Sequence, residues 1–167
     1  KTSLAFVSLK EDGERDFTFY REPGADTVLA EDEIDIKQID QASIFHYGSI
    51  SLISGATRTT SFSLLKRAKE KGVLLSYDPN LRLNLWPSEA QARKGILEGM
   101  EYADVVKVSE EELEFITGIS ETEKALSEMH KLGPEVVLVT YGSKGALVSN
   151  SNGYRRVPGE AVKAVDA

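Results

Sequence analysis

The sequence contains no cysteine, only two histidines and no long apolar run. Disulfide bonds and thiolate chemistry are therefore excluded, and His46 and His130 lie too far apart in the sequence for their spacing to predict a metal site. No stretch approaches the roughly 18 apolar residues that a membrane-spanning helix needs. The first residues also lack the pattern of a signal peptide. We expect a cytoplasmic protein with no membrane partner.

Positive charge is also scarce relative to negative charge. The chain has 20 Lys and Arg against 27 Asp and Glu, which gives a net charge of −7. Such a surface repels phosphate backbones, and no cluster of Lys or Arg offsets it, so a nucleic-acid partner is not expected. With 167 residues, of which 41% are hydrophobic, the chain is long enough to bury one ordinary core.

Two β-rich runs, 2–9 and 16–20, open the chain and are joined through Asp12-Gly13, the strongest hairpin signal in the sequence. This pattern predicts a β-hairpin. Four apolar runs follow, and their starts lie about 30 residues apart, the size of a βαβ unit. The four runs are Ile44-Phe45, Val73–Leu75, Val105-Val106 and Val136–Val139.

Helix signals separate these runs. Ser54 and Gly72 fit the start and end of one helix, Ser88 begins a second after Pro87, and Gly133-Pro134 ends a third. Ala92, Ile96 and Met100 form the inward stripe of the second helix, and Ala125, Met129 and Leu132 form that of the third. Strands that are apolar throughout indicate a parallel sheet covered by helices on both faces. The predicted fold class is α/β with a β-hairpin appendage.

Ligands of such sheets bind beyond the carboxyl ends of the strands. The stretch "SYDPNLRLNLWP", residues 76–87, places Asp78, Asn80 and Arg82 there, after an apolar run. Arg82 offers a planar fork suited to phosphate or a carboxylate, and Asp78 and Asn80 can hold hydroxyl groups. The alternative is that Asp78 and Asn80 only build a turn and Arg82 is a surface charge.

The stretch "VVLVTYGSKGALV", residues 136–148, runs from a buried strand into a glycine-rich turn and back into a strand. Two glycines allow backbone amides to approach an anion closely, and hydroxyl groups add donors. The turn is not a Walker A loop, because its glycine spacing differs and a strand follows. A plain hairpin turn is the favoured interpretation of this stretch alone.

Ser109 and Glu112 follow the third apolar run and are three residues apart, which is the pattern of a helix capping box. Glu112 at this edge could also orient a water on a nucleotide-bound Mg²⁺, and one helix start can do both. Arg21 leaves the hairpin in "FTFYREPGAD", where a cation could close over a ligand, although solitary arginines at strand ends are usually solvated.

In their order and spacing, these stretches resemble the ribokinase-like (PfkB) carbohydrate kinases, and among them the fructokinases most closely. The stretches that carry the resemblance are "LAFVSLKEDGERDFTFYREPGAD", "IFHYGSISL", "LSYDPNLRLNLWPS", "ADVVKVSEEELEFITG" and "VVLVTYGSKGALV". The resemblance implies a three-layer α/β/α fold with a mostly parallel sheet and a β-sheet lid. Residues 1–30 would belong to the lid, and residues 31–167 would form a nucleotide- and sugar-binding core, incomplete at both ends.

The resemblance also implies an activity, the ATP-dependent phosphorylation of a sugar hydroxyl, with fructose as the expected substrate. Arg82 would face the substrate and the transferring phosphate, and Arg21, Asp78 and Asn80 would bind the sugar. The residues that would bind the nucleotide phosphates are Ser109, Thr140, Gly142, Ser143, Lys144 and Gly145.

Metal ions and a partner chain are implied in the same way. Glu112 would support Mg²⁺ through water, and Asp166 would bind a monovalent cation such as K⁺. The family pattern has asparagine where this chain has Ser109, so the resemblance carries over residue by residue to Glu112 and with a substitution to Ser109. A homodimer formed through the β lid is expected.

Two family motifs have no counterpart in the sequence. The Gly-Gly section would precede Lys1, and the Gly-Ala-Gly-Asp motif, which supplies the general base and the anion hole, would follow Ala167. We therefore expect the central section of a longer kinase, inactive as these 167 residues alone. A 2-keto-3-deoxygluconate kinase, or another PfkB sugar kinase, is the nearest alternative. A non-catalytic nucleotide- or sugar-binding domain is the alternative from another class.

Overall fold

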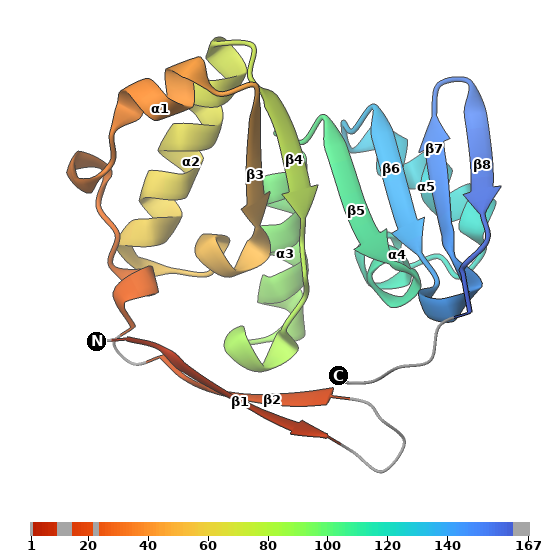
Figure 1. The fold of residues 1–167 in the computed structure, drawn as a ribbon, viewed down its shortest axis with the longest axis horizontal. Coiled ribbons are helices and arrows are strands. Elements are labelled where there is room, and N and C mark those ends of the chain that lie inside the picture. The colour runs from red at the N-terminus through yellow and green to blue at the C-terminus, as the bar shows by residue number, and fades with distance from the viewer. Residues whose placement is uncertain (1, 10–14, 22–23, 162–167) are drawn as a thin grey trace.

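The structure, a computed structural model, describes residues 2–9, 15–21 and 24–161, which form two β-sheets and their helices (Figure 1). The smaller sheet is an antiparallel pair, β1 (Leu4–Leu9) and β2 (Arg15–Tyr20), in which Leu4 lies opposite Tyr20. This pair, called the lid below, lies beneath the rest of the molecule in Figure 1. The two strands of the predicted hairpin are confirmed, whereas its Asp12-Gly13 turn lies outside the described residues.

The larger sheet has six strands in the order β3-β4-β5-β6-β7-β8. The first four are parallel and coincide with the four predicted apolar runs: β3 (Ile44–Gly48), β4 (Leu74–Asp78), β5 (Val105–Ser109) and β6 (Val136–Thr140). The last two are antiparallel to their neighbours: β7 (Ala146–Asn150) and β8 (Gly153–Val157). The sequence does not predict β8, because its five residues are all exposed and it therefore carries no apolar run.

Five α-helices connect the strands: α1 (Ile36–Gln41), α2 (Gly55–Glu70), α3 (Glu89–Met100), α4 (Glu110–Thr117) and α5 (Thr122–Lys131). The short 3₁₀ turns are η1 (Ala25–Thr27), η2 (Glu31–Glu33), η3 (Ser49–Leu52), η4 (Leu83–Leu85) and η5 (Gly142–Lys144). The predicted stripe of Ala92, Ile96 and Met100 is fully buried, and the Ser88 side chain caps α3 by accepting a bond from Gln91 N. Gly72, with φ +72°, ends α2 in the left-handed conformation expected of a C-terminal glycine.

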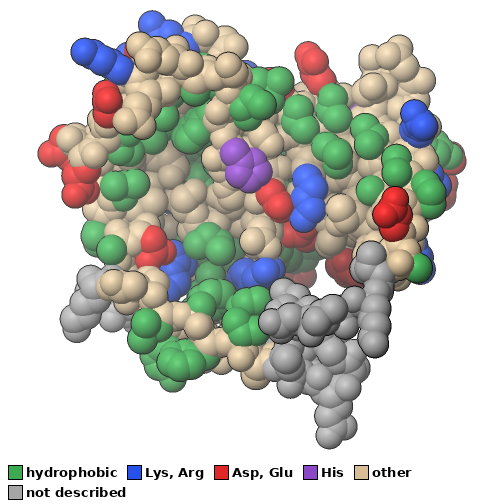
Figure 2. All heavy atoms as spheres, in the orientation of Figure 1, with side chains coloured by type: hydrophobic (Ala, Val, Ile, Leu, Met, Phe, Trp, Pro, Cys, Tyr) green, Lys and Arg blue, Asp and Glu red, His purple; other side chains and the backbone are tan. Residues whose placement is uncertain are grey.

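Helices α2 to α5 lie behind the six-stranded sheet in Figure 1 and bury one of its faces. Tyr77, Val106 and Val137 point into this core and are fully buried. The alternate side chains face the viewer, and hydrophobic groups are scattered across that side in Figure 2. Ile44 on β3, for example, is 59% exposed. The α/β class, the mostly parallel sheet and the small antiparallel lid are confirmed, but the second helical layer expected from the apolar runs does not lie in the described part of the chain.

Candidate active site

The loop after β4 carries three of the candidate site residues and has a defined shape. Asn80 has φ +46°, in the left-handed region that asparagine tolerates better than most residues. The carbonyl of Pro79 accepts a hydrogen bond of 3.1 Å from Ser49 N, which ties the loop to the end of β3. The chain then enters the 3₁₀ turn η4. The predicted shaped loop at the carboxyl end of a buried strand is therefore present.

Glu112 holds this loop in place. One of its carboxylate oxygens, Oε1, accepts a 2.6 Å bond from Leu81 N, and the other, Oε2, accepts a 2.8 Å bond from Ser109 N. Ser109 Oγ in turn accepts a 3.1 Å bond from Glu112 N. The predicted capping box is thus confirmed, and the same carboxylate also joins the start of α4 to the loop after β4.

Arg82 points toward the lid. Its guanidinium carbon lies 5.3 Å from the centre of the Phe17 ring on β2, and its Nη1 donates a 3.0 Å bond to Leu81 O. Asn84 Nδ2 donates a 3.1 Å bond to Phe17 O. The loop after β4 and the lid are therefore in direct contact, and Arg82 lies at that contact.

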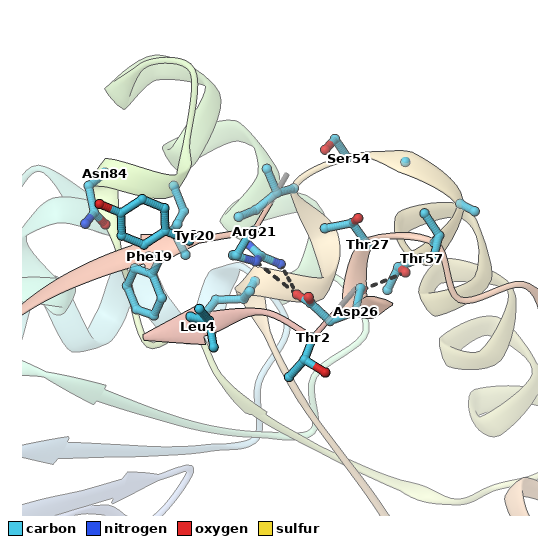
Figure 3. A pocket seen from close by; sticks show the side chains of 16 residues that line it. Thr2, Leu4, Phe19, Tyr20, Arg21, Asp26, Thr27, Ser54, Thr57 and Asn84 are labelled. Atoms are coloured by element: carbon cyan, nitrogen blue, oxygen red, sulfur yellow. Dashed lines mark hydrogen bonds and ion pairs between the residues drawn. The ribbon is translucent and has the colours of Figure 1, made fainter. Parts of the chain in front are cut away.

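Arg21, at the end of the lid, is paired with Asp26 (Figure 3). Its Nε donates a 2.9 Å bond to Asp26 Oδ2, and its Nη2 donates to the same oxygen. The Ser3 hydroxyl donates to the other oxygen, Oδ1. Partial burial on its own would raise the pKa of Asp26, but the hydrogen bonds from Ser3 and Arg21 and the charge of Arg21 together lower it. Asp26 is therefore ionised at neutral pH.

Two neighbouring cavities lie between the lid, the start of α2 and the carboxyl edge of the sheet. The larger has a volume of about 1040 Å³, and Figure 3 shows side chains from the lid and from α2 around it. The smaller, of about 350 Å³, is lined by Asp78 and Asn80 together with Ser49. Arg21 and Asp26 line both cavities. Arg82 lines neither of them, because it is turned toward Phe17.

Two buried polar atoms at the smaller cavity have no hydrogen-bond partner among the described residues: Ser49 Oγ and Asp78 Oδ1. The second carboxylate oxygen of Asp78, Oδ2, is 3.2 Å from Lys107 Nζ. Buried polar atoms in folded proteins are normally paired, so two unpaired ones beside a cavity indicate a place for a polar ligand or water.

The glycine-rich turn after β6 is a hairpin turn, since β6 and β7 pair on either side of it. Gly142 and Gly145 have φ +56° and +100°, and the turn is closed by a 2.9 Å bond from Tyr141 N to Gly145 O. A Cβ on Gly145 would overlap Val157 O, so this position requires glycine for packing as well as for its backbone conformation. The exposed Ser143 and Lys144 side chains leave the turn accessible to an anion.

The parallel topology brings most of the predicted residues to one edge of the sheet. Ser109 and Thr140 are paired neighbours at the ends of β5 and β6. Asp78 and Asn80 lie one strand further along, next to Arg21. Asp166 lies outside the described residues. Among the described residues, no group of three or more His, Asp or Glu is placed to hold a metal ion.

Several polar residues at the cavities, among them Asp26 and Ser49, have no individual site role assigned from the sequence. Asp26 stands in the quoted stretch "FTFYREPGAD" and Ser49 in "IFHYGSISL", but neither has a local pattern that separates it from an ordinary turn residue. Ser49 directly follows β3, so its place at the carboxyl edge agrees with the strand-end rule, whereas the place of Asp26 follows only from the tertiary fold. The lid and the cavities place the chain in the class of α/β folds with a cavity at the carboxyl edge of a parallel sheet, the position where such folds bind ligands.

Comparison with known proteins agrees with this class and narrows it to a family. The family description "pfkB family carbohydrate kinase" matches residues 1–167. The chain belongs to this family. Among the described residues, no helix is long and apolar enough to cross a membrane.

Fructokinases are among the relatives most similar in sequence. The chain is 52% identical over 169 residues to probable fructokinase-5 of Arabidopsis thaliana, covering 99% of this chain and 52% of that protein. It is 47% identical over 167 residues to fructokinase-1 of Zea mays, covering 99% of this chain and 52% of that protein. The chain thus spans about half the length of the curated relatives that it matches.

Solved fructokinase structures share the fold. A structure of fructokinase with bound ATP from Xylella fastidiosa superposes with a TM-score of 0.87 at 31% identity, covering 99% of this chain and 52% of that chain. A double-mutant fructokinase from Vibrio cholerae O395, in a form bound to fructose, ADP and potassium ion, gives a TM-score of 0.86 at 35% identity, covering 97% of this chain and 52% of that chain.

Proposed function

We propose that the complete protein transfers the γ-phosphoryl group of ATP to a hydroxyl group of a sugar, and that this sugar is fructose. The observation that carries the proposal is the match to plant fructokinases over 99% of the chain at about half-identical sequence. A structural neighbour that is 35% identical is described with fructose and ADP bound. The lid, the loop after β4 and the turn after β6 supply groups suited to the two substrates.

The sugar would occupy the cavities beneath the lid. Fructose is a neutral molecule with several hydroxyl groups, and each hydroxyl both donates and accepts hydrogen bonds. The unpaired Asp78 Oδ1 can accept a bond from such a group, and the unpaired Ser49 Oγ can donate or accept one. Asn80 and Arg21 line the same space and add amide and guanidinium donors.

The phosphoryl groups would lie along the edge of the sheet beside the sugar. Phosphoryl transfer depends mainly on alignment and on stabilising charge in the transition state. Arg82 would supply positive charge to the transferring group, and its present contact with Phe17 places it where lid and loop meet. Ser109 and Thr140 would face the nucleotide phosphates together with the turn formed by Gly142, Ser143, Lys144 and Gly145.

The residues present are compatible with a water-mediated Mg²⁺ contact. Each carboxylate oxygen of Glu112 accepts one backbone bond and keeps a further lone pair, which suits hydrogen bonding to a metal-bound water better than direct ligation. Mg²⁺ bound with the nucleotide would neutralise phosphate charge. A role for Asp166 with K⁺ remains a prediction from the sequence.

The lid is also the proposed contact between two copies of the chain. Leu4, Phe6 and Tyr20 share one face of the hairpin and are 53%, 58% and 64% exposed. The Phe6 and Tyr20 rings pack edge to face with centres 5.7 Å apart, so the face is an ordered apolar patch. Light scattering of the complete protein would give a dimer mass if the proposal is right and a monomer mass if it is wrong.

The function is tested by measuring ATP-dependent phosphorylation by the complete protein. Fructose, ribose, adenosine and 2-keto-3-deoxygluconate are compared at matched concentrations, with ADP release as the readout. Fructose is expected to give the highest kcat/KM. A clear preference for the sugar acid would assign the protein to the 2-keto-3-deoxygluconate kinases, and turnover of none of the four would refute the proposed activity.

A further inference from the structure

Asp26 is the centre of a compact polar cluster at the junction of lid and core. Both of its carboxylate oxygens accept hydrogen bonds, Oδ1 from Ser3 and Oδ2 from Arg21. The Asp26 backbone is fixed as well, because its carbonyl accepts a 2.8 Å bond from Thr57 Oγ1 on α2. A single residue thus connects two segments that flank the lid strands to the first turn of a long helix.

The packing around this cluster leaves little freedom to rearrange. Gly24 is buried between its members, and a Cβ at this position would overlap Ser3 Oγ and Asp26 Oδ1. Thr57 Oγ1 also accepts a 2.9 Å bond from Leu29 N, so its contact with Asp26 belongs to a larger network. The carboxylate of Asp26 is therefore held in a fixed position against the guanidinium of Arg21.

The pairing determines the charge that a ligand meets. Arg21 and Asp26 are the only Lys, Arg, Asp or Glu residues among the described residues that line the larger cavity, and their charges cancel. The smaller cavity adds Asp78, which is negative, and His46, whose Nδ1 lies 3.1 Å from Ser76 Oγ. Lys107, the partner of Asp78, does not line the space. Arg82, in the loop after β4, lines neither cavity because it is turned toward Phe17. Among the described residues, a carboxylate on a ligand would therefore meet no Lys or Arg other than the paired Arg21.

A neutral sugar, which has no carboxylate, can still accept hydrogen bonds from Arg21. Asp26 occupies Nε and Nη2 of Arg21, and these are two of the three nitrogens of the guanidinium. The third nitrogen, Nη1, still carries two N–H donors, which suit a hydroxyl oxygen and require no charge on the ligand. The Arg21–Asp26 pair thus keeps hydrogen-bond donors at the cavity, while the Asp26 carboxylate cancels the charge of the guanidinium.

We infer that Asp26 is a specificity-determining residue, which neutralises Arg21 so that the cavity accepts neutral polyhydroxy sugars and discriminates against sugar acids. This inference rests on the proposed function. It separates the two substrates left open by the sequence, because a sugar acid such as 2-keto-3-deoxygluconate would need Arg21 for its carboxylate. The residue acts through Arg21 and takes no part in phosphoryl transfer.

The test is the substitution Asp26→Asn in the complete protein, which removes the charge and keeps the shape of the side chain. Binding of fructose and of 2-keto-3-deoxygluconate is measured by calorimetry, and turnover of both is measured alongside. The ratio of affinities, acid over neutral sugar, is expected to rise tenfold or more, on the order of one charge-assisted hydrogen bond. In turnover, the change should appear in KM for the acid and not in kcat for fructose.

Three further variants separate this role from a structural one. Asp26→Glu keeps the charge and should restore the original ratio. Adding Arg21→Met to Asp26→Asn should abolish the gain for the acid, since the freed guanidinium is then absent. Asp40→Asn breaks an ion pair with Arg67 on α2 that lines neither cavity, and it should leave the ratio unchanged.

Two outcomes would overturn the inference: an unchanged ratio in a folded Asp26→Asn protein, or an equal loss of affinity for both sugars. If Asp26→Asn fails to fold, as thermal unfolding would show, the ratio is measured in Asp26→Ser, which also removes the charge and should raise the ratio in the same direction. The binding ratio does not require catalysis, so a protein that binds with the expected ratio yet turns over neither sugar would refute the proposed function alone.

Discussion

The lid and the six-stranded sheet differ in how much of their apolar surface is buried. In the sheet, Leu75, Val106 and Val137 are completely buried beneath helices α2 to α5. In the lid, Phe6 and Tyr20 are more than half exposed, and only two strands pair with each other. An isolated two-stranded hairpin is marginally stable in water. The sheet therefore accounts for most of the stability of the fold, and the lid depends on its contacts with the core.

Two regions of contact between lid and core lie at the candidate active site. At one end, Ser3 and Arg21 bind Asp26, and at the other, Arg82 and Asn84 meet Phe17. Substitutions in the sheet should thus lower the free energy of unfolding, whereas substitutions at the lid contacts should change activity more than stability. Each of the three predictions below tests one side of this contrast.

The largest effect is expected from Ile96→Ala in the core. Ile96 is fully buried on α3, and removing its methyl and methylene groups should lower the free energy of unfolding by about 2–5 kcal/mol. The matched lid variant is Val7→Ala, at a residue that is 56% exposed and lines neither cavity, which should change the free energy by less than about 0.5 kcal/mol. Urea denaturation of the complete protein measures both, and comparable losses in the two variants would contradict the contrast.

The second prediction concerns Arg82, at the lid contact. Arg82→Ala should lower kcat on the order of 10²–10³-fold, because a charge on the transferring phosphoryl group matters most in the transition state. The dissociation constant of ATP should change much less. The control is Arg67→Ala, at an arginine paired with Asp40 at 2.6 Å on α2 and away from the cavities, which should leave kcat unchanged. Weaker ATP binding with an unaltered kcat would show that Arg82 acts only in binding.

The elements that the sequence predicts well are those marked by a pattern that recurs along the chain. The apolar runs locate β3 to β6, and parallel topology then places Asp78, Ser109 and Thr140 at one edge. The same runs also predict burial on both faces, yet only one face is covered by the described helices, because the apolar character of a strand does not reveal which segment covers it. β8 is missed because all its residues are exposed.

The site itself depends on contacts between residues far apart in the sequence. Ser3 reaches Asp26 across 23 positions, and Thr57 reaches it across 31. Ser49 lies at a strand end, where ligand-binding residues are expected, but only the structure shows that its hydroxyl is buried beside a cavity without a partner among the described residues. A single sequence records residue types and not these distances, so the pairing that neutralises Arg21 could not be predicted from it.

The smallest effect is expected at Glu112, which belongs to the core but holds the loop that reaches the lid. Glu112→Gln keeps one acceptor oxygen and places an amide nitrogen against a backbone N–H, so either Leu81 N or Ser109 N loses its partner. The free energy of unfolding should fall by about 1–3 kcal/mol, the usual cost of an unsatisfied buried donor. Glu110→Gln, on the exposed side of the same helical turn, is the control and should be neutral.

The variant also separates the two roles of Glu112. If the carboxylate only caps α4 and fixes the loop, kcat should fall by the same factor at every Mg²⁺ concentration, because the position of Arg82 has changed. If it also orients a metal-bound water, the Mg²⁺ concentration for half-maximal rate should rise in Glu112→Gln and stay unchanged in Glu110→Gln. We expect the second result, because both Glu112 oxygens retain a lone pair after their backbone bonds are made. The same Mg²⁺ concentration for half-maximal rate in the wild type and in Glu112→Gln would leave Glu112 with its structural role alone.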